Sequence, residues 1–269
     1  MNIAESHRLR AAIDSIGVDV MALIEYGSRA HGTADENSDH DLIGIFVEHD
    51  HQLYGLERAE TLIYRIHPDG KLQRMGVSDA ETRSGADVIE LSLHPLRKFV
   101  SLAAGGNPSV LSTLWAPAVL QLTGGRASAL LIGHRDAFLS KHAGFRHAGY
   151  ARAQRDALLG RTNKRTNRPE LVSAHGYDTK YAAHMIRLLL AGLDLVRDRA
   201  FHLPMKPEQV EIIREIRRGE IALDDLLTLS EKLETDLTTE TEDSELPDSA
   251  DIAAINDLLR QIRNTHLLR

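Results

Sequence analysis

Four residues near the N-terminus have types and spacing suited to phosphate chemistry: Gly27, Ser28, Asp39 and Asp41. The apolar run from Val18 to Tyr26 predicts a buried strand that ends at the Gly-Ser pair. A glycine at a strand end lets the backbone approach a ligand closely, and the serine hydroxyl and the following amides are donors for triphosphate oxygens. We therefore expect Gly27 and Ser28 to bind the phosphates of a nucleotide.

A second strand is predicted from Asp41 to Val47, and Asp39 lies two residues before its start. Because strand side chains alternate between faces, Asp39 and Asp41 are expected to point the same way. Two neighbouring carboxylates repel each other, and the usual compensation is a hard divalent cation with oxygen ligands. Magnesium fits best, because it keeps coordination positions for water and substrate phosphates. An Asp-x-Asp pair alone often caps a helix or lines a turn, but the strand, Gly-Ser, Asp-x-Asp and strand together favour a functional site.

The segment GSRAHGTADENSDHDLIGIFV, residues 27–47, resembles the signature of the DNA polymerase β-like nucleotidyltransferase superfamily. More narrowly, the chain resembles the RNA repair pathway polymerase-β family, whose members are predicted nucleotidyltransferases of bacteria and phages. The likeness extends from about Val18 to Leu259, although Ser112 stands where the family pattern has an acidic residue. Several later segments carry the narrower likeness: Leu96-Arg97-Lys98-Phe99, Gly106-Asn107-Pro108, Gly176-Tyr177-Asp178-Thr179-Lys180, His184 with Arg187-Leu188, residues 213–220 and Leu246-Pro247.

The resemblance implies a third carboxylate on a neighbouring strand and a site for two Mg²⁺ ions, with Mn²⁺ as a possible replacement. One ion would activate the attacking oxygen and the other would hold the triphosphate. The two candidates are Asp87 and Glu90, which are an odd number of residues apart and so cannot share a face of a regular strand. The family pattern places an acid six residues before Leu96, which favours Glu90, with Asp87 as its substitute.

Three basic residues, Lys180, His184 and Arg187, are spaced i, i+4 and i+7 and so line one stripe of a predicted helix. Such a stripe is suited to binding triphosphate oxygens and to stabilising charge on the leaving pyrophosphate. The commoner fate of basic residues is a solvated helix face. His184 and Arg187 have a further alternative, which is to hold two parts of the chain together. The resemblance around Lys180 favours nucleotide binding for that residue.

The elements that must position these residues divide into two modules. Predicted strands at 18–26, 41–47 and 88–93 follow a first helix at 3–16, and helical periodicity then dominates from residue 96 onward. We predict an α/β (α+β) nucleotidyltransferase module with a mixed sheet in residues 1–115 and an all-α nucleotide- and substrate-binding module in residues 116–269. The predicted helices span 96–104, 108–115, 126–159, 179–199, 207–217, 222–236 and 250–268, and the acidic stretch 234–249 is predicted to be an exposed or mobile linker.

The composition of the chain limits the kinds of partner that we expect it to bind. The chain of 269 residues has a formal charge of −7, which argues against coating nucleic acid through whole-molecule attraction, and it has no cysteine and no apolar run of membrane-spanning length. We expect a cytoplasmic protein without a membrane partner; the sequence carries no signal of oligomeric state. Four cations between Arg161 and Arg168 form a predicted loop that recruits a nucleic acid backbone or is simply exposed. An aromatic content of 4% argues against a long base-stacking channel.

The expected substrates are an NTP and a hydroxyl acceptor. The family association and the basic loop favour an RNA end, and the alternatives are a small molecule, such as an antibiotic, or a protein hydroxyl, as in toxin-like nucleotidylation. A different class is a catalytically silent nucleotide-binding protein, but intact Asp39 and Asp41 with a third acid argue against loss of turnover.

Overall fold

The computed structural model describes residues 3–36, 38–76, 87–161 and 168–267, and the chain divides into two compact units. The units are interleaved along the chain, which differs from the single boundary predicted after residue 115. The reason is that residues beyond 115 contribute a strand and two helices to the first unit. The first unit comprises Met1–Ala103, Ser112–Arg135 and Ile252–Arg269, and the second comprises Ala104–Leu111 and Asp136–Asp251.

The first unit is built on a six-stranded mixed sheet with the strand order β4-β3-β5-β2-β1-β6. The central pair, β2 and β5, is parallel, and every other neighbouring pair is antiparallel. The strands are β1 (Val20–Tyr26), β2 (His40–Phe46), β3 (Leu62–Ile66), β4 (Leu72–Met75), β5 (Ile89–Pro95) and β6 (Gln121–Thr123).

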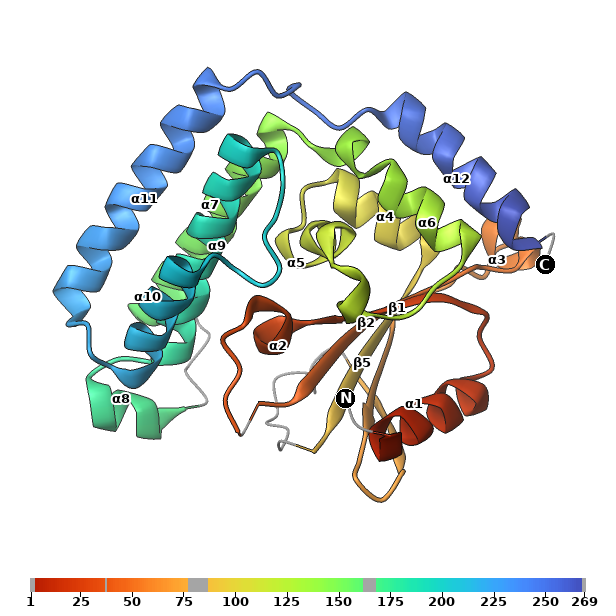
Figure 1. The fold of residues 1–269 in the computed structure, drawn as a ribbon, viewed down its shortest axis with the longest axis horizontal. Coiled ribbons are helices and arrows are strands. Elements are labelled where there is room, and N and C mark those ends of the chain that lie inside the picture. The colour runs from red at the N-terminus through yellow and green to blue at the C-terminus, as the bar shows by residue number, and fades with distance from the viewer. Residues whose placement is uncertain (1–2, 37, 77–86, 162–167, 268–269) are drawn as a thin grey trace. The chain divides into compact units, whose positions relative to one another are not determined.

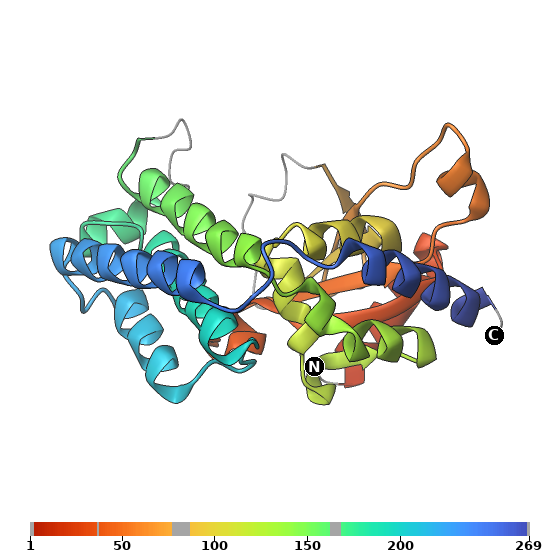
Figure 2. The same cartoon turned by 90° about the horizontal axis from the view of Figure 1, so that it is seen from above.

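Helices cover both faces of this sheet. Helix α1 packs through Leu9 and Ala12 against Leu42 and Leu91 on one face, and helices α4, α6 and α12 lie on the opposite side (Figures 1 and 2). Beyond its first two residues β2 is buried on both faces, whereas β5 buries Ile89, Leu91 and Leu93 on one face and carries Glu90, Ser92 and His94 on the other. The helices of this unit are α1 (Ile3–Ile16), α2 (Gly27–His31), α3 (Asp50–Tyr54), α4 (Leu96–Ala104), α6 (Arg126–Gly133) and α12 (Ile252–Leu267), with 3-10 turns at Thr113–Trp115 and Ala118–Leu120; α5 (Pro108–Ser112) spans the boundary with the second unit.

The second unit is helical, and α9 is its centre. This helix packs against α7, α8, α10 and α11, and its apolar residues from Ala182 to Val196 are buried on several faces (Figure 1). A helix that is apolar around most of its circumference must be covered by neighbours, which is the position α9 holds. The helices are α7 (Lys141–Leu158), α8 (Pro169–His175), α9 (Thr179–Asp198), α10 (Pro207–Arg218) and α11 (Leu223–Asp243), preceded by a 3-10 turn at Arg135–Phe138.

The linker predicted at 234–249 is wrong for residues 234–243, whereas residues 244–249 lie outside any helix or strand and are mostly exposed. Helix α11 continues through Asp243, with Leu237 and Thr241 buried and Glu240 accepting two hydrogen bonds from Arg197 at 2.5 and 2.6 Å. After the helix ends, Leu246 is buried as well. The acidic composition suggested disorder, but one buried residue per turn is enough to hold a helix against its neighbours.

The remaining expectations about elements are confirmed in outline. The α/β and helical fold classes, the first helix, the three main strands and most helices lie where predicted. The predicted helix at 126–159 is divided into α6, a 3-10 turn and α7, and the short elements α2, α3, α8 and β6 were not predicted. Most of the basic run from Arg161 to Arg168 lies outside the described residues. No helix in the described ranges combines the length and apolar character needed to span a membrane.

Candidate functional site

Three carboxylates meet at one end of the parallel strand pair in the first unit. Asp41 in β2 is the register partner of Glu90 in β5, and Asp39 comes just before β2. One oxygen from each of Asp39, Asp41 and Glu90 lies within 4.8 Å of the others. Asp87 lies in the turn before β5, is exposed and does not belong to this cluster. Of the two candidates for a third acid, the fold therefore brings Glu90 to the aspartates.

The Gly27 turn packs directly against this cluster. Gly27 has a φ of +69°, and a Cβ atom at this position would lie 2.0 Å from Oδ2 of Asp41. Only glycine satisfies both the left-handed backbone and the close approach. Ser28 follows it in the first turn of α2, so the predicted phosphate-binding pair adjoins the carboxylates. The role of Gly27 and Ser28 in binding a nucleotide stays a prediction.

Two residues inside the recognised segment hold its backbone, and sequence reasoning missed both. Arg29 donates from Nε to the carbonyl of Asp39 at 3.0 Å and from Nη2 to the carbonyl of Ser38 at 2.7 Å. His31 donates from Nδ1 to the carbonyl of Gly27 at 2.5 Å. Arg29 thus fixes the loop that presents Asp39, and His31 fixes the glycine turn. Both act on carbonyl groups, and residue types alone do not reveal such contacts.

Arg65 is a third residue that sequence reasoning missed. It lies on β3 as the register partner of Glu90, and its Nη2 and Nε donate to Oε1 of Glu90 at 2.7 and 2.9 Å. The guanidinium is almost fully buried, with 9% of the side chain exposed, so solvent screens this ion pair weakly. Arg65 therefore orients the carboxylate of Glu90 from the neighbouring strand.

On the opposite face of the sheet, a buried polar group supports the start of β2. His40 lies between the two aspartates in sequence but points towards α1, where its Nδ1 is 2.6 Å from Oε1 of Glu25 and its Nε2 is 3.6 Å from Oε2 of Glu5. The hydrogen bond from His40 holds the pKa of the Glu25 carboxyl below its ordinary value. This alternation confirms that Asp39 and Asp41 share the face away from α1.

The predicted basic stripe lies on α9 in the second unit. Lys180 is exposed, whereas His184 and Arg187 are each partly buried. Arg187 donates from Nη2 to Nδ1 of His184 at 2.8 Å. Burial and the adjacent Arg187 charge lower the pKa of His184 to about 3, so its imidazole is neutral at pH 7. His184 therefore offers an Nε2–H donor and no charge, and nucleotide binding by the stripe stays a prediction.

The segment before Lys180 also has a structural role. Gly176 ends α8 in the left-handed conformation, with a φ of +80°. Asp178 then caps α9, because its Oδ1 accepts hydrogen bonds from the backbone amides of Lys180 and Tyr181 at 3.0 and 3.3 Å. Arg168 pairs with the same carboxylate at 3.2 Å. The Gly-Tyr-Asp-Thr-Lys segment thus builds a helix-to-helix turn whatever Lys180 binds.

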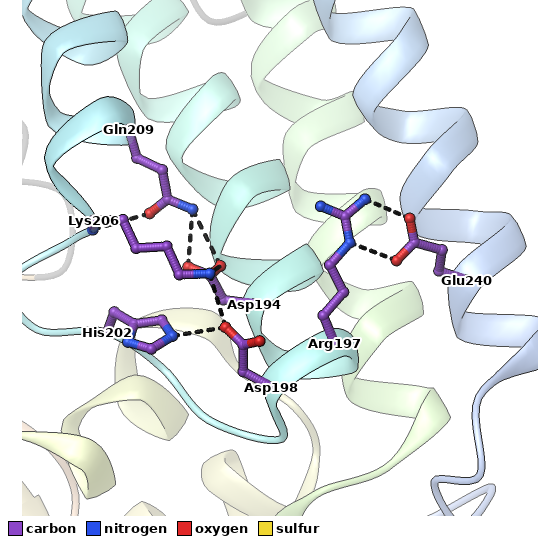
Figure 3. Close-up of polar contacts among 7 residues, drawn as sticks. All are labelled: Asp194, Arg197, Asp198, His202, Lys206, Gln209 and Glu240. Atoms are coloured by element: carbon purple, nitrogen blue, oxygen red, sulfur yellow. Dashed lines mark hydrogen bonds and ion pairs between the residues drawn. The ribbon is translucent and has the colours of Figure 1, made fainter.

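A second group of metal-ligating residues occurs in the second unit, at Asp194, Asp198 and His202. Here Nζ of Lys206 lies 2.8 Å from Oδ1 of Asp194 and 2.8 Å from Oδ2 of Asp198 (Figure 3). Gln209 donates to both oxygens of Asp194 as well (Figure 3). The protein's own ammonium group occupies the position that a metal ion would take, so this group holds α9 and α10 together and is no metal site.

Comparison with protein families identifies the family to which the chain belongs. The model of the RNA repair pathway DNA polymerase beta family matches residues 1–261, nearly the whole chain. The chain belongs to this family. The resemblance seen in residues 27–47 is thereby confirmed. In this RNA repair pathway polymerase-β member, that segment supplies the glycine turn and two of the three carboxylates of the acidic cluster. Ser112, which departs from the family pattern, is buried at the end of α5 and lies outside the acidic cluster.

Comparison with solved structures adds a remote likeness. One match is the crystal structure of a nucleotidyltransferase-like protein from Exiguobacterium sibiricum, which is 10% identical, with 90% of this chain and 75% of that chain covered and a TM-score of 0.31. A TM-score this low supports no statement about the site. No curated protein matches the chain.

Proposed function

We propose that this RNA repair pathway polymerase-β protein is a divalent-metal-dependent nucleotidyltransferase that moves a nucleoside monophosphate from an NTP to a hydroxyl at an RNA end. The observation that carries the proposal is the cluster of Asp39, Asp41 and Glu90 oxygens within 4.8 Å, packed against the Gly27 turn. Family membership supports the polymerase-β type of chemistry and the RNA acceptor.

The cluster fits a hard divalent cation. Its ligands are carboxylate oxygens from three residues with no sulfur or nitrogen donor, the set that Mg²⁺ prefers and Mn²⁺ accepts. Asp39, Asp41 and Glu90 would hold the metal ions, two in the proposed site. Bound there, the ions would neutralise charge on the triphosphate and on the attacking oxygen.

The protein's own residues take the following parts. The amides after Gly27 and the hydroxyl of Ser28 donate to phosphate oxygens. The acceptor oxygen forms a bond to the α-phosphorus while the bond to the leaving pyrophosphate breaks, and the proton of the acceptor hydroxyl passes to the carboxylate of Glu90, which Arg65 orients. Positioning and charge neutralisation supply most of the acceleration.

The test uses NTPs labelled at the α-phosphate, with Mg²⁺, with and without a short RNA. Label on the RNA is expected, and it should disappear when the RNA terminus is oxidised with periodate. Label on the protein itself, or no transfer at all, overturns the RNA assignment in favour of a protein acceptor or a catalytically silent protein. Asp39→Asn and Asp41→Asn should each abolish transfer without unfolding the chain. Asp87→Asn is the matched control, because this exposed acid lies outside the cluster.

A further inference from the structure

A cavity of about 400 Å³ lies in the first unit, away from the acidic cluster. It is bordered by the loop after α3 and by the first turns of α4, and Pro95 at the end of β5 is part of its wall. Glu90 is near the start of the same strand, five residues earlier, so the cavity and the cluster are about 17 Å apart at the usual rise of about 3.3 Å per residue. The cavity is large enough for a nucleotide-sized ligand.

Cations dominate the polar wall of this cavity. Arg58 and Arg97 are exposed, and within the described ranges neither guanidinium forms an ion pair or hydrogen bond. Lys98 pairs with Glu60 at 3.0 Å, but 42% and 72% of these side chains are exposed, and an exposed pair of this kind is weak enough to exchange partners.

The other carboxylate in the cavity wall, that of Glu48, already has a hydrogen-bond partner. Oε1 of Glu48 accepts a hydrogen bond from the backbone amide of Arg97 at 2.9 Å, which caps the start of α4, and the Glu48 side chain is buried. Its charge therefore offsets the helix terminus rather than the Arg97 guanidinium. In a protein with a net charge of −7, the cavity thus presents two uncompensated guanidinium groups and one exchangeable ammonium group to solvent.

Apolar groups lie beside these cations. Leu53 and Leu102 line the cavity; Tyr54, the last residue of α3, is 84% exposed and Leu56 in the loop after it is fully exposed, and both lie outside the cavity wall. Tyr54 and Arg58 are exposed and only four residues apart in the chain, and an aromatic ring near cations in one segment is suited to single-stranded nucleic acid, because the ring stacks on a base while the cations hold the backbone. A free phosphate ion would use only the cations and leave the ring and the apolar wall unexplained.

We propose that this cavity binds single-stranded RNA, with Arg58 and Arg97 holding backbone phosphates and Tyr54 stacking on a base. The choice of RNA rests on the proposed function, in which an RNA end is the acceptor. The cavity holds the strand at a distance from the reacting end. At the stacked spacing of about 3.4 Å per nucleotide, about five nucleotides cover the distance between the two sites, and an extended strand needs fewer.

The experiment measures binding of a fluorescent 12-nucleotide RNA by the full chain, by anisotropy, in EDTA and without NTP. Arg58→Ala/Arg97→Ala should weaken binding about tenfold or more, because charge-assisted contacts to phosphate are lost. It should also reduce the slope of log K against log salt by about 1.4, twice the value of about 0.7 per phosphate on a single strand. Arg58→Lys/Arg97→Lys should retain the slope. Tyr54→Ala should weaken binding with the slope unchanged.

The matched control is Arg10→Ala/Arg74→Ala, which removes the same charge from two exposed arginines of the first unit that do not line the cavity. Binding by this variant should match wild type. Equal losses in the two double variants, or wild-type binding by Arg58→Ala/Arg97→Ala, would overturn the proposal. Displacement of the RNA by AMP or inorganic phosphate at equal phosphate concentration would reassign the cavity to a small phosphate ligand and overturn it too.

The two proposals fail separately. Asp41→Asn should bind the RNA as wild type does, since binding is measured without metal. If no transfer to RNA occurs while Arg58→Ala/Arg97→Ala still weakens RNA binding selectively, the proposed reaction is wrong and the cavity assignment stands. If transfer occurs while that variant binds RNA normally, the cavity assignment alone is wrong.

Discussion

The substitution Gly27→Ala tests the contact between the glycine turn and the metal-binding carboxylates. The new Cβ would lie 2.0 Å from Oδ2 of Asp41, whereas ordinary van der Waals contact begins near 3.4 Å, so the two must separate by 1.4 Å (3.4 − 2.0). A displacement of about 1 Å in a catalytic group can lower the rate about a hundredfold, and we expect a loss of at least this size. The left-handed φ of +69° adds about 1–2 kcal/mol of strain to the folded state.

Gly17→Ala separates the two effects. Gly17 has a nearly identical φ of +72°, but a Cβ there meets nothing within 4 Å. Gly17→Ala should lose about 1–2 kcal/mol of unfolding free energy in urea and Gly27→Ala at least as much, and only Gly27→Ala should lose nucleotide transfer and weaken the metal dependence of that transfer. Wild-type transfer by Gly27→Ala, or an equal loss of transfer by Gly17→Ala, would refute the reasoning.

Three further predictions concern Arg65 and two buried residues of the second unit. Arg65→Leu should lower transfer or metal affinity about 10- to 100-fold, with partial rescue by Arg65→Lys, in a titration of activity with Mg²⁺; unchanged metal dependence would contradict the orienting role. Burial lowers the pKa of His147 to about 4. The folded state therefore keeps its full stability near pH 7 and loses stability as the pH falls below about 6.5, the ordinary pKa of histidine. The loss in unfolding free energy at pH 4 should be about 3 kcal/mol. Urea unfolding of His147→Leu should therefore depend less on pH than that of wild type or of the exposed control His134→Gln. Leu237→Ala should cost about 3 kcal/mol and Thr239→Ala almost nothing, whereas equal, negligible effects in urea unfolding would support the linker predicted from composition.

The fold was predictable wherever one local pattern decides the structure. The apolar runs that became β1 and β2 and the periodicity that became α9 are read from neighbouring residues alone. The error at 234–243 arose because α11 is held there by residues distant in sequence, such as Arg197 opposite Glu240. The interleaving of the units was hidden for the same reason, since β6 and α12 join a sheet whose other strands are encoded much earlier.

The candidate site also contains residues that local sequence predicts and one residue that it does not. Asp39 and Asp41 share a face because of strand alternation, which the sequence contains, and Gly27 is adjacent to them because β1 and β2 pair through a register that the short connection allows. Arg65 is different, because it reaches Glu90 only through the order β3-β5-β2 in the sheet. Nothing near Arg65 in sequence distinguishes it from other arginines, and yet its partner is one of the three carboxylates. A group that orients a catalytic residue from another strand is therefore found through topology, and its effect on metal affinity is the property that separates it from an ordinary buried ion pair.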